Sequence, residues 1–369
     1  TESKKRKQSS TMTRVERVIG VTEEELVKQS NRQQYICKQV GSETLHFVNA
    51  QTGDLTPIGA FSTPTLKELQ DQLAFKEKTE TKQCQFHCLY GIDIGELQTR
   101  LETHSLVQIA GNFNCLNVSN RRRTPDDGRM VELAHQQTTQ GPAATFGPLS
   151  SHLYRVHFSL PPNYSGQTLD HQINLLDNVT DYTGVPVNGK LTLTGRERTI
   201  PNADEEIDEI AQQVRVGLQT DCHVMYGRNK QNREVCLLDQ NNGDFTKLPR
   251  IDQCHVAVTN WNSLTRDHTK RHVPDWIKGK KEEIFTLSRM LLRAAYEGVY
   301  LAALTRGTEH LYLTLVGGGV FGNPNPLIVQ ELARAHKKWA NHSASRLKSV
   351  SLCAYSPADN VEDLLKQEG

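Results

Sequence analysis

A run of glycines around residue 319 is the part of the sequence whose chemistry is easiest to interpret. The six residues before it, Leu311–Val316, are almost wholly apolar and too short for a helix, so they are predicted to form a buried strand. A helix is predicted to follow the run, with Asn325 as its N-cap and Pro326 in its first turn. Glycine lets a ligand approach the backbone closely, and exposed N–H groups beside the positive end of a helix favour phosphate. The residues of this predicted anion cradle are Gly317, Gly318, Gly319, Val320, Phe321, Gly322 and Asn323.

The same letters match the dinucleotide fingerprint, as Gly317-x-Gly319-x-x-Gly322. In a Rossmann domain that pattern lies in an early βα turn, and an acidic residue follows about 20 positions later. Here the pattern comes near the end of the chain, and the next predicted strand, Ser349–Tyr355, ends in no carboxylate. A nicotinamide-dinucleotide oxidoreductase is therefore an alternative that the context disfavours, and a tight turn that binds nothing is another.

Composition restricts the class of protein. The 369 residues include 43 basic and 42 acidic side chains, so the chain as a whole is not a nucleic-acid-binding polycation. No apolar run approaches the length of a membrane span, and eight scattered cysteines fit a reducing, cytoplasmic compartment. The sequence Cys84-Gln-Phe-His87-Cys88 lacks a second ligand pair at zinc-finger spacing, so buried thiols are expected, with no metal and no cofactor.

Strands and helices are predicted to alternate in the second part of the chain. Apolar strands are expected at Ser105–Ala110, Cys254–Thr259 and Val350–Tyr355, in addition to the strand before the glycines. A long helix is expected at Glu282–Ala303, because its apolar residues recur every three or four positions. Strands joined by helices in this way predict an α/β fold with a parallel sheet covered on both faces.

Other segments are harder to interpret. Leu153–Leu160 is predicted to be a strand, Gly166–Leu176 a helix, and the glycine- and proline-containing stretch from Gln136 to Ala144 irregular. Two β-rich runs, Tyr35–Asp54 and Met225–Asp244, resemble each other and both end in Gly-Asp. Each is predicted to be a hairpin with glycine in its turn. Such additions to a scaffold usually shape contacts with partners.

An ordered set of motifs resembles the macrodomain, the ADP-ribose-binding α/β/α fold. The sequence is similar to a divergent macrodomain-like family of ADP-ribose-processing proteins, which includes a hydrolase of ADP-ribosyl-ubiquitin. The resemblance covers roughly residues 105 to 357. The motifs that carry it are Gly-Asn-Phe-x-x-Leu at 111–116, Thr-Gln-Gly-Pro-Ala at 139–143, Gly-Gln-Thr…Gln-Ile-Asn-Leu-Leu at 166–176, Ala-Ala-Tyr-Glu at 294–297 and Leu-x-Gly-Gly-Gly-x-Phe-Gly-Asn at 315–323.

The resemblance implies a macrodomain-like three-layer α/β/α sandwich with an extra N-terminal segment and β-hairpin insertions. The expected division is a disordered basic tail at 1–20, an N-terminal extension at 21–104 and an ADP-ribose-binding domain at 105–369. The expected partners are ADP-ribose and an ADP-ribosylated protein, with ubiquitin as a candidate, and neither nucleic acid nor membrane. Phe321 would pack on a ribose beside the diphosphate. The further ADP-ribose-binding residues that the resemblance implies are Asn112, Phe113, Asn114, Thr139 and Gln140.

The implied activity is removal of ADP-ribose from arginine, which breaks an N-glycosidic bond through a positively charged, oxocarbenium-like transition state. Carboxylates stabilise that charge and can activate water or hold the leaving guanidinium. The predicted loop after Cys254–Thr259 should leave the same sheet edge as the glycines, which makes Asp267 and Asp275 the candidate catalytic acids, with Glu283 in support. Two alternatives remain open. These acids could be ordinary solvated loop residues beside basic neighbours, or the protein could be a reader module that binds ADP-ribose without hydrolysing it.

Overall fold

The structure is a computed structural model of the chain. The residues that the structure describes are 12–38, 44–76, 83–117, 123–134, 140–160, 165–191, 201, 203–231, 233–265, 281–354 and 361–368. Among the described helices, none is both long and apolar enough to cross a membrane.

A nine-stranded mixed sheet runs through the molecule in the order β1-β2-β3-β6-β9-β5-β10-β11-β4. Strands β9, β5, β10, β11 and β4 are mutually parallel, whereas β1, β2, β3, β6 and β9 pair antiparallel. The strands of this sheet are β1 Ile36–Lys38, β2 Leu45–Val48, β3 Leu55–Ser62, β4 Gln85–Tyr90, β5 Ser105–Ala110, β6 Gly217–His223, β9 Arg250–Val256, β10 His310–Thr314 and β11 Ser349–Ala354. A separate antiparallel pair consists of β7 Tyr226–Arg228 and β8 Glu234–Cys236.

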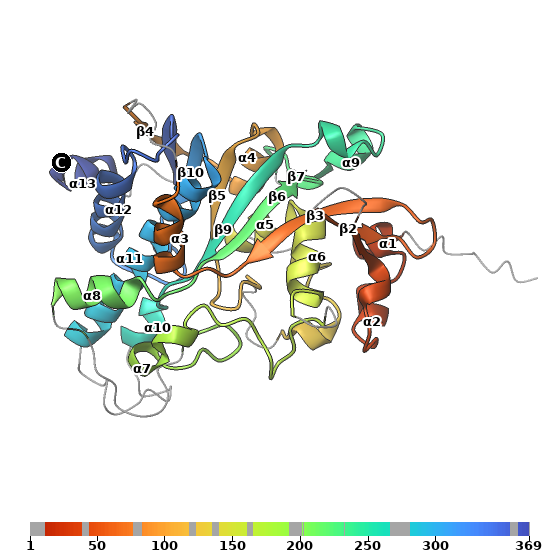
Figure 1. Cartoon of the computed structure of the whole chain (residues 1–369), viewed down its shortest axis with the longest axis horizontal. Helices are drawn as coiled ribbons and strands as arrows, with labels where there is room; N and C mark the ends of the chain where they lie inside the picture. Colours follow the sequence, from red (N-terminus) through yellow and green to blue (C-terminus); the bar gives the residue numbers. More distant parts are fainter. Residues whose placement is uncertain are drawn as a thin grey trace, which may run out of the picture.

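The helices lie on both faces of the sheet and at its ends (Figure 1). Several begin with a Thr-x-x-Glu capping box, as α3 does with Thr65 and Glu68, so their first N–H groups are satisfied locally. The α-helices are α1 Arg14–Ile19, α2 Glu23–Leu26, α3 Leu66–Leu73, α4 Ile94–Leu97, α5 Gln140–Phe146, α6 Leu149–His157, α7 Thr180–Thr183, α8 Asp204–Ala211, α9 Leu237–Gln240, α10 Trp261–Thr265, α11 Lys281–Arg306, α12 Asn325–Trp339 and α13 Val361–Glu368.

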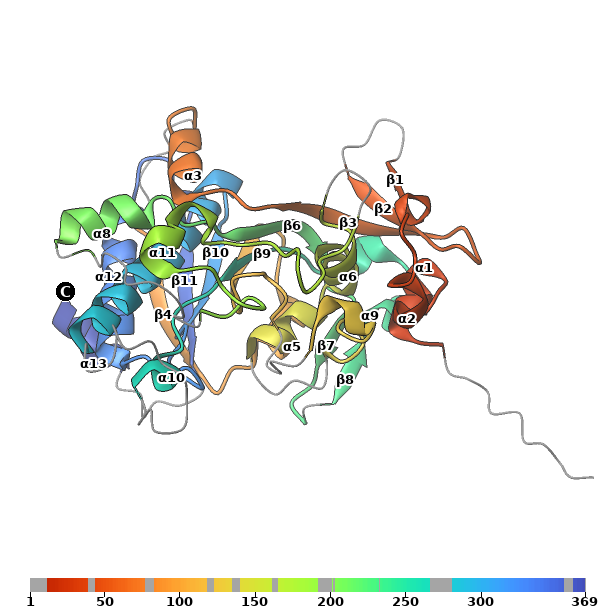
Figure 2. The same ribbon diagram turned by 90° about the horizontal axis from the view of Figure 1, so that it is seen from below.

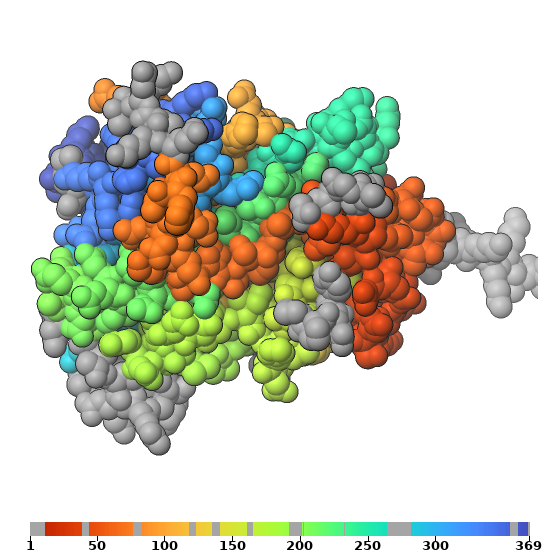
Figure 3. Space-filling view, in the orientation of Figure 1, coloured from red at the N-terminus to blue at the C-terminus, as the bar shows by residue number. Residues whose placement is uncertain are grey.

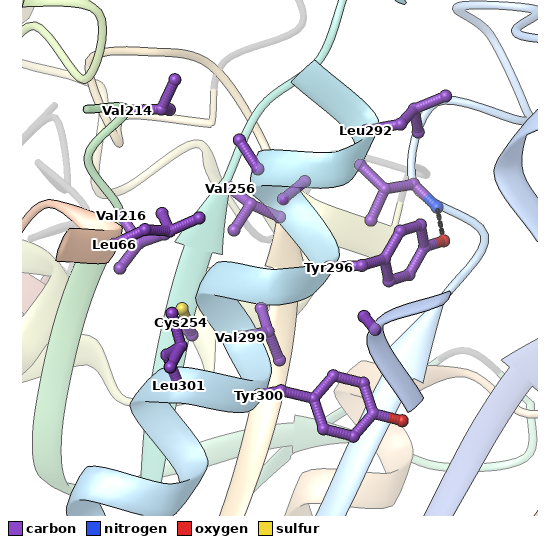
Figure 4. Packing of buried hydrophobic residues seen from close by; sticks show 14 of the residues in the cluster. Leu66, Val214, Val216, Cys254, Val256, Leu292, Tyr296, Val299, Tyr300 and Leu301 are labelled. Carbon is purple, nitrogen blue, oxygen red and sulfur yellow. Dashed lines mark hydrogen bonds between the residues drawn. The ribbon is translucent and has the colours of Figure 1, made fainter. Parts of the chain in front are cut away.

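The central strand β5 shows how the layers are held together. Leu106 belongs to the largest apolar core, which it shares with α11, α12 and α3. Val107 and Ile109 point the other way, into a smaller core with α4 and α5. Successive side chains of a strand alternate between faces, so an apolar strand needs a helical layer on each side. The predicted three-layer α/β/α sandwich is therefore confirmed, and Figure 4 shows α11 lying across the sheet over Cys254 and Val256.

The N-terminal segments extend the sheet beyond this sandwich. Strand β3 runs from the region of β2 and α1 towards α3 (Figure 2). In the space-filling view the N-terminal segments cover one end of the molecule beside the residues around α6 (Figure 3). They share their own apolar core with α6. Residues 14–19 of the predicted tail form α1, and β4 joins the main sheet from before residue 105. The boundary at 104/105 thus lies within one sheet, and the division of domains there stays a prediction.

Three local predictions were wrong. The segment predicted as the strand Leu153–Leu160 is largely helix α6, because Leu149, Leu153 and Val156 follow helical spacing and are fully buried on one face. Part of the stretch predicted to be irregular is helix α5. Residues 166–176 form no helix: the side chain of Gln167 there bonds the carbonyl groups of Asn114 and Arg155 instead.

Both predicted hairpins contain an antiparallel strand pair, β1–β2 and β7–β8. Gly53 has a positive φ in the turn between β2 and β3, as expected. Gly243 also has a positive φ, but it follows helix α9 instead of a strand. The first pair, moreover, is continuous with the main sheet and is not a separate addition.

Candidate functional site

The glycine run and the loop after β9 meet at the carboxyl edge of the parallel strands. Both loops leave this edge because β9, β5 and β10 are parallel neighbours. Asn262 lies in the first turn of α10 and bonds the glycine run twice. Its backbone N–H donates to the carbonyl of Phe321 at 2.8 Å, and its side-chain amide donates to the carbonyl of Val320 at 3.1 Å. The predicted proximity of these two loops is present in the structure.

Two glycines of the run have no space for a side chain. Gly317 has φ of 78°, and a Cβ there would lie 2.5 Å from Nδ2 of Asn323. Gly322 has φ of 68°, and a Cβ there would lie 2.2 Å from Nδ2 of Asn262. Both the left-handed backbone and the close neighbours require glycine at these positions. The chain can therefore fold tightly back on itself between β10 and α12.

The tip of the loop is exposed and carries backbone donors without acceptors among the described residues. The N–H groups of Gly318, Gly322 and Asn323 are used in turns within the loop. For Gly319, Val320 and Phe321, no acceptor is recorded among the described residues. A Cβ on Gly319 would meet nothing within 4 Å, and Val320 is 73% exposed. Successive amide N–H groups without acceptors are a backbone arrangement that can bind an anion.

The side chain of Asn323 holds the base of the loop. It is 3% exposed, and its amide donates to the carbonyl of Thr259 at 2.9 Å and to that of Gly317 at 3.2 Å. Its oxygen accepts from the hydroxyl of Thr259 at 3.1 Å, and that hydroxyl also bonds Ser288 of α11 at 2.5 Å. Asn323 was expected to bind ADP-ribose; the structure places its amide in contact with protein groups that fix the loop.

Tyr296 of α11 fixes the start of the loop. Its hydroxyl donates to the carbonyl of Thr314 at 2.8 Å. It also accepts from the N–H of Val316 at 3.2 Å, the bond that is dashed in Figure 4. The side chain is fully buried, and this burial raises the pKa of Tyr296 well above its ordinary value, so the hydroxyl stays protonated. The carboxyl end of β10 is therefore hydrogen-bonded to the long helix α11.

The loop after β5 is also organised by its own asparagines. Asn114 is 1% exposed; its amide donates to Gln172 at 3.0 Å, and its oxygen accepts from the N–H of Leu116 at 3.1 Å. Phe113 is buried in the largest core. Asn112 is buried as well, and its N–H donates to the side chain of Asn117 at 3.3 Å. Asn114 and Phe113 thus fix the loop after β5, the strand next to β10.

The predicted catalytic acids are only partly within the described residues. Asp267 and Asp275 lie outside them, as does Thr139, while Gln140 begins helix α5. Glu283 lies in the first turn of α11 and is half-buried. Because α11 leads from the end of β9 to the start of β10, its first turn lies at the sheet edge that carries the glycine loop.

An aromatic pair stands next to the same loops. The rings of Trp261 and Phe285 meet edge to face, with centroids 6.2 Å apart and an interplanar angle of 82°. Phe285 is 37% exposed, although it is a large apolar side chain. Neither this pair nor the contacts of Thr259, Asn262 and Tyr296 was predicted from the sequence. Only the position of Tyr296 in one of the family-like motifs gave a signal.

Comparison with known proteins gives a limited result. No protein-family model matches the chain, and no curated protein matches it. Among solved structures, the chain is similar to poly(ADP-ribose) glycohydrolase from Deinococcus radiodurans in complex with ADP-ribose, at 11% identity and a TM-score of 0.41, over 84% of this chain and 94% of that one. It is also similar to poly(ADP-ribose) glycohydrolase from Thermomonospora curvata, at 12% identity and a TM-score of 0.40, over 88% and 93%. Similarity at this level assigns no activity by itself.

Proposed function

We propose that the protein is an ADP-ribosylhydrolase that releases ADP-ribose from an arginine side chain of a modified protein. The observation that carries the proposal is the row of N–H groups at Gly319, Val320 and Phe321, which have no acceptor among the described residues. The row lies on an exposed loop at the carboxyl edge of a parallel sheet. A diphosphate bears oxygens on two adjacent phosphorus atoms and suits such a row of donors. Open α/β sheets bind their ligands at this edge.

The neighbouring groups suit the rest of an ADP-ribose molecule. The Trp261–Phe285 pair offers an exposed aromatic edge beside the loop, against which a ribose or a base can pack. Buried asparagines and Gln172 define the adjoining loop after β5. An anion cradle flanked by an apolar surface fits a nucleotide diphosphate better than it fits a free inorganic anion.

In the proposed reaction, water attacks the anomeric carbon of the proximal ribose as the bond to the guanidinium nitrogen breaks. Asp267 and Asp275 act as the guanidinium-holding and water-activating carboxylates, and Glu283 supports them from the first turn of α11. Their negative charge stabilises the oxocarbenium-like transition state. The glycine loop supplies binding energy and orientation through the diphosphate.

Ubiquitin is the proposed first substrate to test, because the sequence motifs resemble the family of the Legionella effector MavL, an ADP-ribosyl-ubiquitin hydrolase. The experiment incubates arginine-ADP-ribosylated ubiquitin with the protein and follows the intact mass of ubiquitin. We expect loss of the ADP-ribose mass, and no loss with Asp267→Ala or Asp275→Ala. A protein with Gly319→Glu should also be inactive, because the new carboxylate repels the diphosphate.

The same assay separates the proposed hydrolase from a reader module. A reader would leave the modified ubiquitin intact while still binding free ADP-ribose, measured by isothermal titration calorimetry. If neither hydrolysis nor binding of ADP-ribose is seen with a folded protein, the proposed function is wrong. Unchanged hydrolysis in both aspartate variants would instead place the acids elsewhere.

A further inference from the structure

A second pocket lies away from the glycine loop, between the chain that follows β5 and helices α5 and α6. Its apolar lining includes Leu116, Met130 and Pro142. Its polar lining includes Asn117 and Thr145. None of the residues recorded as lining it comes from the glycine loop, α10 or α11, so this pocket is distinct from the candidate ADP-ribose site.

His152 lines the pocket with an unsatisfied side chain. It is 1% exposed, and neither of its ring nitrogens has a hydrogen-bond partner among the described residues. Burial, and secondly the positive charge of Arg155, lower the pKa of His152 well below its ordinary value, so the ring is neutral. A neutral imidazole has one N–H donor and one acceptor, and leaving a buried polar group unpaired costs about 1 to 3 kcal/mol. The pocket therefore offers a donor that needs a partner.

Positive charge surrounds this histidine. Arg123 and Arg129 also line the pocket; Arg129 is paired with Glu24, whereas no carboxylate is recorded against Arg123 in the described parts of the chain. Arg155 follows His152 by three positions on α6 and therefore lies on the same helix face. Arg123 and Arg155 thus give the pocket a positive field that no ion pair to them offsets within the described residues.

Arg155 strengthens that field because its charge is buried without a counter-ion. It is 0% exposed and bonds only neutral acceptors, the carbonyl of Cys115 at 2.9 Å and the side chain of Gln219 at 3.2 Å. Its Nη2 atom has no partner among the described residues, and burial lowers the pKa of Arg155 to about 10. A buried cation without a paired anion is unfavourable, and a bound anion nearby would relieve that cost.

The pocket has room for about one water-sized group and is open on one side. We propose that it binds a small oxyanion such as acetate or phosphate, one oxygen of which enters the pocket and accepts the N–H of His152 while another pairs with Arg123 at the opening. Asn117 connects the pocket to the loop after β5. It has φ of 54°, donates to Thr145 at 2.6 Å and accepts from the N–H of Asn112 at 3.3 Å. An anion in the pocket would therefore stabilise a residue that shapes the neighbouring loop.

The test is isothermal titration calorimetry with sodium phosphate and, separately, sodium acetate, in a chloride buffer at constant ionic strength. All titrations use a Gly319→Glu background, because its carboxylate blocks anion binding at the glycine loop. Saturable binding of one anion at one site per chain is expected, and Arg123→Ala should weaken it at least tenfold. Arg100→Ala, an exposed arginine paired with Glu96, should leave the affinity unchanged as a charge-matched control.

His152→Gln provides a second variant, which should also weaken binding if it folds as the parent does by circular dichroism. A preference for phosphate over acetate identifies a phosphate-bearing ligand, and the reverse identifies a carboxylate. Two results would overturn the proposal: no saturable heat with either anion, or an affinity that Arg123→Ala and Arg100→Ala change equally. In the first case, buried water satisfies His152.

Discussion

The side chain of Asn323 closes the glycine loop by donating to the carbonyl oxygen of Gly317, six residues earlier, at 3.2 Å. The backbone N–H of the same asparagine donates to the same carbonyl at 2.9 Å. One residue thus ties both ends of the loop together, and its bonds to Thr259 tie the loop to the end of β9. The shape of the row of N–H groups therefore depends on this contact as well as on the glycines.

We expect Asn323→Ala to lose both stability and ligand binding. The substitution leaves the buried carbonyl of Thr259 without its donor, which costs about 1 to 3 kcal/mol of unfolding free energy. Because the loop is then less ordered, affinity for ADP-ribose should fall about tenfold or more. Urea denaturation and calorimetry measure the two effects. A stable variant with full affinity would show that Asn323 does not organise the loop.

Tyr296→Phe tests the anchor at the start of the loop. The ring stays in place, but the carbonyl of Thr314 and the N–H of Val316 lose their partner, so stability should fall by about 1 to 3 kcal/mol and ADP-ribose affinity should fall as well. Tyr300→Phe is the matched control, since its hydroxyl lies one turn later on α11 and bonds His336 away from the loop. Equal losses of affinity in the two variants would contradict a specific role for Tyr296.

Gly319 and Gly322 should respond differently to alanine. A Cβ at Gly319 meets open space, so Gly319→Ala should change the melting temperature little. Gly322 has φ of 68° and a contact at 2.2 Å with Asn262, so Gly322→Ala should be strongly destabilising. Differential scanning fluorimetry compares the two. Similar melting temperatures would mean that the loop can rearrange to accept a side chain at Gly322.

Glu23 should make stability depend on acid pH. Its burial raises the pKa, but the hydrogen bond and charge of His157 and the N–H groups of Val131 and Glu132 outweigh this, and the pKa of Glu23 is lowered from 4.5. A carboxyl group whose pKa is lowered by folding stabilises the protein above its unfolded pKa, and this stabilisation is lost as pH falls through the folded value.

Urea denaturation between pH 7 and pH 3 should therefore show a loss of stability on the acid side. Glu23→Gln should be less stable at pH 7 by about 3 kcal/mol or more, since a buried charged partner is removed, and should have a flatter acid limb. Glu24→Gln, an exposed neighbour in the same helix, is the control. Parallel pH profiles for the parent and Glu23→Gln would rule out this source of acid sensitivity.

The sequence predicted the elements whose patterns are long or wholly apolar. Helix α11 repeats its apolar residues over many turns, and β5 and β11 are short apolar runs. The residues that each element must bury can therefore be recognised from its own sequence. Helix α6 was missed because Ser150 and Ser151 interrupt its apolar pattern. Their hydroxyl groups are fully buried and bond the carbonyls of Pro57 and Ile58 in β3, which no local pattern reveals.

For the site, the glycine loop and its position at the sheet edge were predictable, since both follow from a strand, a glycine run and a helix. The contacts that hold the loop were not. Thr259, Ser288 and Asn323 are far apart in sequence and meet only because α11 crosses over β9 and β10. Asn323, which the sequence suggested as a ligand contact, instead bonds backbone carbonyl groups where these elements cross.

The strand order of the sheet also has a consequence for biosynthesis. Strand β5 is flanked by β9 and β10, and β4 pairs only with β11, which ends at Ala354. Strands β4 and β5 thus leave the ribosome long before these neighbours exist, and their backbone N–H and C=O groups must wait for later parts of the chain. Such non-local pairing slows folding and exposes strand edges to aggregation. A nascent chain that stalls before β10 would be a substrate for chaperones, and production in two fragments should yield a functional protein only if the fragments refold together.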